Sequence, residues 1–529
     1  MHLASRILFY SGLAGLASCL NPPSGPDATA ESIRYSDTYE PPRFKNGQRI
    51  KDIGEALAES HVLYAVALEE DHLPGVAYGL VVDDSLVFSG AFGYSNLETG
   101  TPATTRTFFR IASMSKSFTA MAILKLRDEG KLRLSDPAAY YVPDMEQLTY
   151  LTRDATPVSI YNLLTMTAGF PEDNPWGDRF LDISDADLLK LVRSGLSFST
   201  VPSLNYEYSN LGYGLLGHII TEVSGIPFQE YITRNILLPL GMTDTYYEYT
   251  EVPQERLAQG YRWENGQWKA EPMLHDGAFG SMGGLITTIE DFSKYIAFHL
   301  SAWPPGSDPP DNGPVRRSTL REMQQITHPG FITVPGRFGK ADALLIRGYG
   351  YGLVSMKDTD GVVETGHNGG LPGFGSSYMF YPEYGLGIMA FGNLTYVGGT
   401  VKAVNYQVIR ELIGQGLFEP RILPVSRILE TRKMQVVELI SGWDPDLEKD
   451  IVAANLYLDR DREDRIREAK DLLEKLGEIV SIGPLEPENQ LRGSFVLNGT
   501  EHQLKVSFTL TPEAEPKVQW LTLELVPGS

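Results

Sequence analysis

The chain has 529 residues, of which 42% are apolar and 21% charged, and its formal net charge at pH 7 is −22. This composition is that of a folded globular protein, and the length predicts one large domain with a smaller one. The negative charge is not offset by any basic run, so it would repel a phosphate backbone and argues against nucleic-acid binding.

The first 18 residues have the pattern of a signal peptide. Arg6 precedes an apolar run over residues 7–17, and no acidic residue occurs before Asp27. The run is too short to span a bilayer, which takes about 20 apolar residues. It ends in Leu16-Ala17-Ser18-Cys19, which resembles the lipobox of bacterial lipoproteins. We therefore expect cleavage before Cys19 and a lipid anchor on that cysteine.

An ordinary signal peptide, cut near residues 28–30 with Cys19 discarded, is the alternative. A mitochondrial presequence fits less well, because the apolar block is too uniform for an amphipathic helix. Both leading interpretations place the mature protein outside the cytoplasm, in the periplasm or cell envelope. Cys19 is the only cysteine, so no intramolecular disulfide can form.

The rest of the chain divides into three predicted parts. Residues 19–50 are rich in Pro, Ser and charge and are expected to be a tether. Residues 51–416 begin with a strand pair over 76–93 and end with strand pairs over 350–393, with helical patterns between them, which predicts an α/β layer structure. Residues 417–529 are expected to form a separate small α+β domain. The helical patterns lie at residues 113–129, 211–224, 227–238 and 289–300.

The strongest chemical signal is Ser113 with Lys116 in the run Phe109–Ala120. Residues three apart share a helix face, so the lysine amine can reach the serine hydroxyl. A serine hydroxyl becomes a good nucleophile only when a base takes its proton, and lysine can be that base when burial lowers its pKa. An ordinary exposed pair is the alternative, and the pair alone does not decide between them.

Two further elements follow in the chain, Tyr206-Glu207-Tyr208-Ser209-Asn210 and Gly366-His367-Asn368-Gly369-Gly370. With Ser113 and Lys116, these residue types in this order resemble the penicillin-recognising serine hydrolases: class C β-lactamases, D-alanyl-D-alanine carboxypeptidases, D-aminopeptidases and related esterases. The resemblance spans about residues 74–393. It implies a β-lactamase/transpeptidase-like fold, in which a mostly antiparallel sheet is flanked by helices beside an all-helical region.

By this resemblance Ser113 forms the acyl-enzyme and Lys116 accepts its proton. Tyr208 shares the proton transfer, serves the leaving group and helps to activate the deacylating water. A phenol can act as a base only if positive charge lowers its pKa from about 10, and Lys116 would supply that charge. The backbone N–H groups of Ser113 and Gly370 would form the oxyanion hole.

The remaining residues are expected to bind or orient substrate. Asn210 would hydrogen-bond Lys116 and a substrate amide, and His367 occupies the place of a lysine in class C β-lactamases. Asn368 lies beside it, and Gly369 would let substrate approach the strand closely. Each residue has a structural alternative, in which Tyr208 is a core tyrosine, Asn210 a helix N-cap and His367 a surface histidine.

Other chemistries have less support. No Gly-x-Ser-x-Gly elbow occurs, so an α/β-hydrolase nucleophile is missing. The nine histidines include no pair at the spacing of helical zinc sites. We expect neither a metal nor a cofactor, and the sequence does not predict an oligomeric state.

His367 in place of lysine favours peptide or amide hydrolysis of the carboxypeptidase or aminopeptidase type. Carboxylesterase or weak β-lactamase activity is the alternative, and a penicillin-binding sensor or scaffold is the non-enzyme one. The expected partner is a small peptide, ester or β-lactam. A histidine holds a substrate carboxylate well only when protonated, so specificity for a free carboxylate is in doubt. Within the loop 171–179, Trp176 and Arg179 are candidate substrate contacts, unless the loop is only packed surface.

Lipidation can be tested directly. If Cys19 carries the lipid, Cys19→Ala abolishes partitioning of the protein into membranes, because acyl chains supply the affinity. Membrane and soluble fractions are compared by immunoblot. Unchanged partitioning of the variant would point to the ordinary signal peptide.

Overall fold

The computed structural model describes residues 34–47, 49–50, 54–306, 312–333, 345–359 and 361–526. Cys19 and the expected signal peptide lie outside these residues. The chain forms two compact units: the large unit, Pro41–Pro424, and the small unit, which holds the described residues 34–40 and 425–526. Within the described ranges, no helix has the length and apolarity needed to cross a membrane.

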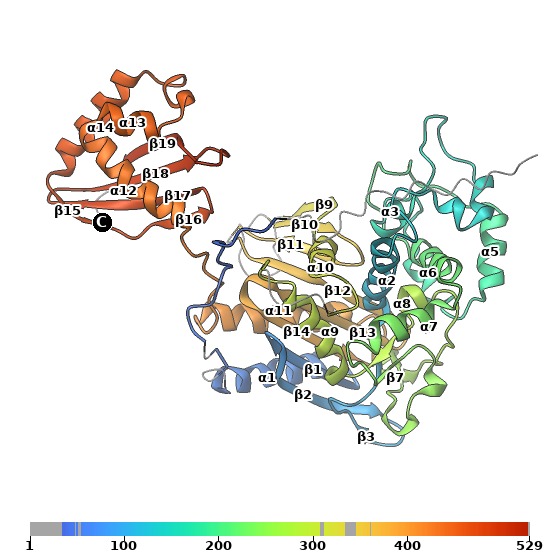
Figure 1. The fold of residues 1–529 in the computed structure, drawn as a ribbon. Coiled ribbons are helices and arrows are strands. Elements are labelled where there is room, and N and C mark those ends of the chain that lie inside the picture. The colour runs from blue at the N-terminus through green and yellow to red at the C-terminus, as the bar shows by residue number, and fades with distance from the viewer. Residues whose placement is uncertain are drawn as a thin grey trace, which may run out of the picture. The chain divides into compact units, whose positions relative to one another are not determined.

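The large unit is built on a nine-stranded sheet (Figure 1). Every neighbouring pair of strands is antiparallel. The first strands of the chain lie beside the last ones of the unit, so that distant segments form one sheet. In spatial order the strands are β3 (Thr101–Pro102), β2 (Ser85–Asn96), β1 (Gly75–Val82), β14 (Leu386–Gly392), β13 (Phe374–Tyr381), β12 (Val363–Leu371), β11 (Val354–Lys357), β10 (Leu345–Tyr349) and β9 (His328–Thr333).

Helices cover both faces of this sheet. The apolar strands alternate their side chains between two cores: in β1, Val76 and Tyr78 enter one core, and Ala77 and Val81 enter the other. The first core is covered by α1 (Gly54–Glu70) and α11 (Gly398–Gly414). The second is covered by α9 (Ile289–Ser301) and by α2 (Lys116–Asp128).

An all-helical region continues the second core (Figure 1). Its central helix is α6 (Asn210–Ser224), which packs against α2 and is buried along most of its length. The predicted α/β architecture, an antiparallel sheet flanked by helices with a helical region, is confirmed. The other helices here are α3 (Ile160–Leu164), α4 (Asn174–Gly177), α5 (Asp185–Arg193), α7 (Phe228–Ile232) and α8 (Gly280–Gly283); α10 (Arg317–Met323) contacts α2.

Short strands complete the large unit. A three-stranded sheet places β8 (Ile286–Thr287) between β4 (Phe109–Arg110) and β5 (Thr245–Tyr246). Strand β4 directly precedes the segment that contains Ser113. A separate hairpin joins β6 (Tyr261–Glu264) and β7 (Gln267–Ala270).

The small unit is an α+β fold. Its five strands form one sheet, and its apolar side chains meet those of its helices in a separate core. Helix α14 begins at Arg462, because the Asp461 carboxylate accepts the Glu463 N–H and caps the helix. The elements are α12 (Arg427–Gly442), α13 (Pro445–Ile451), α14 (Arg462–Leu476), β15 (Ile479–Ile482), β16 (Glu486–Asn489), β17 (Arg492–Gly499), β18 (Gln503–Leu510) and β19 (Val518–Leu525).

The boundaries of the large unit differ from the predicted 51 and 416. Phe418 is 2% exposed and packs in the α1/α11 core, so the chain after residue 416 still belongs to this unit. At the other end, Arg43 pairs with Ile422, and the buried Arg49 guanidinium lies 2.7 Å from the Asp83 carboxylate. Residues 41–47 and 49–50 of the expected tether therefore belong to the large unit. Pro and charge content in the sequence did not reveal these long-range contacts.

If the large unit extends past residue 416, Phe418 should contribute to its stability. Phe418→Ala in the full chain should lower the free energy of unfolding of the large unit by about 3 to 5 kcal/mol, because it leaves a cavity in the core. Leu458→Ala is the control, since Leu458 is 82% exposed in the small unit, and its effect should stay within about 0.5 kcal/mol. Urea denaturation measures both. Equal, small effects would show that the large unit ends before Phe418.

Candidate active site

Ser113 lies on a 3₁₀ turn, Ala112–Ser115, and α2 begins only at Lys116. The helix predicted from residue 113 therefore starts later. Ala112 has a φ of 49°, in the left-handed region that non-glycine residues rarely adopt. The turn is held by the Ser115 hydroxyl, which donates to the Ala112 carbonyl at 2.7 Å. The strained backbone presents Ser113 to the cavity ahead of the helix.

The Lys116 amine is surrounded by three oxygen acceptors. Its Nζ lies 3.0 Å from Ser113 Oγ, 2.7 Å from Asn210 Oδ1 and 2.9 Å from the Met282 carbonyl oxygen. The side chain is fully buried. A neutral amine has two N–H donors and one lone pair. If the two carbonyl-type oxygens take the donors, the lone pair faces the Ser113 hydroxyl.

Burial lowers the pKa of Lys116 from its usual value to about 7, although the Asp178 and Asp173 carboxylates oppose this shift. Desolvation penalises the ammonium form more than the nearby negative charges stabilise it. Near neutral pH a large fraction of Lys116 is therefore neutral and able to take the Ser113 proton.

The pKa of Tyr208 is shifted in the opposite direction from the expected one. Its pKa is raised well above the usual value, mainly by burial, and the Ser113 hydroxyl offsets this only in part. Lys116 Nζ lies 5.0 Å from the centre of the ring, so its charge does not overcome the desolvation. The expectation that Lys116 lowers the pKa of Tyr208 is therefore wrong. Tyr208 is a protonated phenol suited to give a proton rather than to take one.

Asn210 is the first residue of α6 rather than its N-cap. Ser209 caps the helix by accepting the Gly212 N–H. Asp173 holds the same helix start, because its carboxylate accepts the backbone N–H of Asn210 at 2.6 Å. The Asn210 amide nitrogen donates to Asn174 Oδ1 at 3.2 Å. The side chain is thus fixed with its oxygen toward Lys116.

Strand β12 passes beside Ser113 with one edge open. It pairs with β13 as far as Leu371, but its last partner on β11 faces Gly366. Residues 367–371 therefore have a free edge on the β11 side. Gly370 lines the cavity together with Ser113, as the oxyanion-hole prediction requires.

His367 is 6% exposed, so the surface-histidine alternative is wrong. Its Nδ1 lies 2.5 Å from the Asn368 carbonyl oxygen and its Nε2 lies 3.3 Å from the Tyr349 hydroxyl. This pattern fits a neutral ring that donates from Nδ1. Burial, with a smaller contribution from Lys116, lowers the pKa of His367 to about 3. The ring is therefore neutral and cannot replace the lysine as a cation.

Gly369 also has a packing role within the protein, and the close approach of substrate to it stays a prediction. A Cβ on this residue would lie 2.2 Å from the Ile111 carbonyl oxygen and 2.3 Å from Ser376 Oγ. The missing side chain thus lets β12 pack against the backbone before Ser113. Asn368 lines the cavity, and its Oδ1 accepts a hydrogen bond from Ser377 at 3.1 Å.

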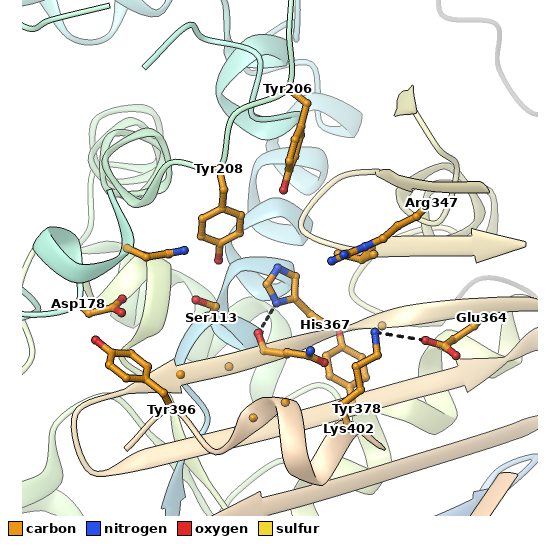
Figure 2. Close-up of a pocket in the computed structure, with 18 residues that line it drawn as sticks. Ser113, Asp178, Tyr206, Tyr208, Arg347, Glu364, His367, Tyr378, Tyr396 and Lys402 are labelled. Atoms are coloured by element: carbon orange, nitrogen blue, oxygen red, sulfur yellow. Dashed lines mark hydrogen bonds and ion pairs between the residues drawn. The ribbon is translucent and has the colours of Figure 1, made fainter. Parts of the chain in front are cut away.

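These residues open onto a cavity of about 300 Å³ (Figure 2). Asp178 and Tyr396 lie on one side of Ser113, and Arg347 lies on the other (Figure 2). Ser113, Tyr208, His367, Asn368, Gly369 and Gly370 line it, and so do Asn174, Asp178, Tyr206, Arg347, Val354, Glu364, Gly366, Tyr378, Tyr396, Gly398, Gly399 and Lys402.

Sequence reasoning missed the charged residues of this cavity. In the loop 171–179 it selected Trp176 and Arg179, whereas Asp178 and Asn174 line the cavity. Trp176 instead packs against Phe180. Composition identified the loop, but only the packed backbone shows which side chains turn inward. Arg347 has no sequence motif around it that could have marked it.

Lys402 forms an ion pair with the buried Glu364 at 3.7 Å. Arg347 has no acidic partner within 4.0 Å in the described part of the chain, and it is exposed at the cavity rim. Across the described ranges, no cluster of His, Cys, Asp and Glu could hold a metal ion.

The family model described as Beta-lactamase matches residues 56–411. The chain belongs to the β-lactamase family. This assignment supports serine hydrolase chemistry in general and confirms the family resemblance seen in the three sequence elements.

Among curated proteins, Protein flp of Staphylococcus aureus (strain COL) is 29% identical over 349 residues, which are 65% of this chain and 64% of that protein. Beta-lactamase-like protein 2 of Dictyostelium discoideum is 28% identical over 273 residues, covering 50% of this chain and 49% of that protein. The chain thus spans less than two thirds of these relatives.

Solved structures share the fold. The octameric penicillin-binding protein homologue from Pyrococcus abyssi aligns with a TM-score of 0.57 at 22% identity, over 88% of this chain and 95% of that one. A penicillin-binding protein from Bacillus halodurans aligns with a TM-score of 0.52 at 24% identity, over 65% and 98%. At these identities the likeness concerns the fold alone.

The buried Lys116 predicts a pH profile. The rate at which a fluorophosphonate labels Ser113 should rise about tenfold per pH unit and level off above about pH 7, because the neutral amine is the base. Lys116→Arg, which stays protonated, should lower the rate at least about 100-fold. Lys125→Arg on the same helix is the control and should leave the profile unchanged. A midpoint near pH 10 would contradict the effect of burial.

Proposed function

We propose that this protein is a serine hydrolase that forms an acyl-enzyme on Ser113 and acts on peptide or amide bonds of small substrates. The observation that carries the proposal is the 3.0 Å contact between Ser113 Oγ and a fully buried Lys116 amine. A buried lysine without a catalytic task would be better replaced by an apolar residue, because desolvation of its charge is unfavourable.

The first half of the reaction follows from this contact. Neutral Lys116 takes the Ser113 proton while Oγ bonds to the substrate carbonyl carbon. The carbonyl oxygen becomes an oxyanion that the N–H groups of Ser113 and Gly370 stabilise. Tyr208, a neutral phenol, donates its proton to the leaving amine and regains one from the Lys116 ammonium. The C–N bond breaks and the acyl-enzyme is left.

Deacylation reverses these roles. Lys116, neutral again, draws a proton through Tyr208 from a water molecule, whose oxygen attacks the acyl carbon. Ser113 Oγ leaves and is reprotonated by the same pair. The route needs no metal or cofactor, since each proton moves between protein groups, water and substrate.

Arg347 supports an amide substrate that carries a carboxylate. It is a cation at the cavity rim without an acidic partner in the described part of the chain. Because His367 is neutral, Arg347 rather than the third sequence element would attract the carboxylate. Ester hydrolysis and slow β-lactam hydrolysis use the same acyl-enzyme and are the alternatives. Penicillin-binding without turnover is the non-enzyme alternative.

We also propose that the protein is exported and anchored to the cell envelope through Cys19. The support is the N-terminal pattern of Arg6, an apolar run and a lipobox-like ending. The anchor would place the cavity in a compartment where small peptides and peptide-like antibiotics occur.

Intact-protein mass spectrometry tests the acyl-enzyme. Wild type should gain one adduct from an activated fluorophosphonate and one from a penicillin, and Ser113→Ala should gain none. Ser194→Ala, which removes an exposed serine, is the control and should behave as wild type. Steady turnover of chromogenic amides, with a penicillin adduct that clears slowly, supports the peptidase. A single burst without turnover supports the sensor, and absence of any adduct overturns the proposal.

A further inference from the structure

Asp178 is a buried carboxylate that faces the cavity without a cationic partner. Its residue is 3% exposed, yet it lines the same cavity as Ser113. In the described part of the chain, no Lys, Arg or His nitrogen lies within 4.0 Å of its oxygens. Figure 2 shows it beside the Tyr396 phenol, on one side of the nucleophile. A buried charge left in this way is costly unless a ligand pairs with it.

The groups around Asp178 do not neutralise it. Burial raises the pKa of Asp178 to about 6, whereas Lys116, the Tyr396 hydroxyl and, more weakly, Arg179 lower it. The carboxylate is thus mostly ionised at neutral pH. Lys116 does not form the missing ion pair, because its Nζ is already bonded to Ser113, Asn210 and Met282.

Asp178 would lie on the acyl side of the scissile bond if the leaving group of the substrate points toward Tyr208 and Arg347. A Cβ on Gly370 would lie 2.8 Å from Tyr396 Cδ1, so the Tyr396 and Asp178 pair is at the Gly370 end of the open β12 edge. Gly370 contributes to the oxyanion hole. Arg347 and Asp178 lie on opposite sides of Ser113 (Figure 2). A substrate along this edge with its leaving group toward Tyr208 and Arg347 would therefore extend its acyl part past Gly370 toward Asp178.

We propose that Asp178 binds an ammonium group on the acyl side of the substrate, so that the preferred substrates are small amides or peptides with a free amine on the acylating residue. This inference rests on the proposed acyl-enzyme at Ser113. With Arg347 at the other end, the cavity has a negative and a positive pole. Its volume of about 300 Å³ is at the small end for ligand sites. A short zwitterionic peptide fits these constraints.

The test compares alanine p-nitroanilide, in both enantiomers, with its N-acetyl derivative. Wild type should cleave the free amine with the higher kcat/KM. Asp178→Asn, which keeps the shape and removes the charge, should reduce this preference by about 10- to 100-fold. The N-acetyl substrate controls for any change in the Lys116 pKa, because that change affects both substrates. Asp182→Asn, an exposed acid in the same segment, should leave the preference unchanged.

The outcomes separate the two proposals. Fluorophosphonate labelling of Ser113 in wild type and Asp178→Asn shows that each folds and has a reactive nucleophile. If Ser113 is labelled but wild type shows no preference for the free amine, or Asp178→Asn keeps the preference, the ammonium site is wrong. If Ser113 is not labelled in wild type, the acyl-enzyme fails and the substrate inference fails with it.

Discussion

The burial of one lysine amine organises the active site. Lys116 is fully buried at the start of α2, and its three oxygen neighbours come from the Ser113 turn, from α6 and from the α8 segment. Each neighbour therefore depends on a different part of the large unit being in place. The desolvation that opposes the ammonium form also makes the amine a base near pH 7. Burial of this amine lowers the stability of the fold, and the same burial makes the amine reactive as a base.

The same desolvation sets the protonation states of the neighbouring groups. It keeps Tyr208 as a neutral phenol and His367 as a neutral imidazole. The charges left in the cavity are Asp178 and Arg347, with the Lys402 and Glu364 pair between strand and helix. In the proposed mechanism, reactivity comes from groups whose charge is suppressed, and substrate selection comes from groups that stay charged.

The open edge of β12 lies where substrate binding and the proposed reaction at Ser113 would both take place. Because β11 stops opposite Gly366, a substrate backbone can lie along residues 367–371. Gly369 brings this edge against the Ile111 backbone, and therefore close to Ser113. A larger residue would separate Ser113 from the strand that contains Gly370, whose N–H is proposed to stabilise the oxyanion. The fold shared with penicillin-binding proteins thus places the edge, and the side chains around it decide the substrate.

Local patterns in the sequence determined much of this protein. Apolar periodicity marked strand pairs at both ends of the large unit and the helices α6 and α9, and three short elements marked Ser113, Lys116, Tyr208, Asn210 and His367. These features depend on residues a few positions apart, so they can be predicted from the sequence alone. Only the tertiary structure decided the direction of the Tyr208 pKa, the neutrality of His367 and the inward orientation of Asp178 and Arg347. It also decided that Phe418 and Arg49 belong to the large unit. Desolvation and packing depend on contacts between segments that are far apart in the sequence. Local sequence patterns do not predict which of these segments come into contact.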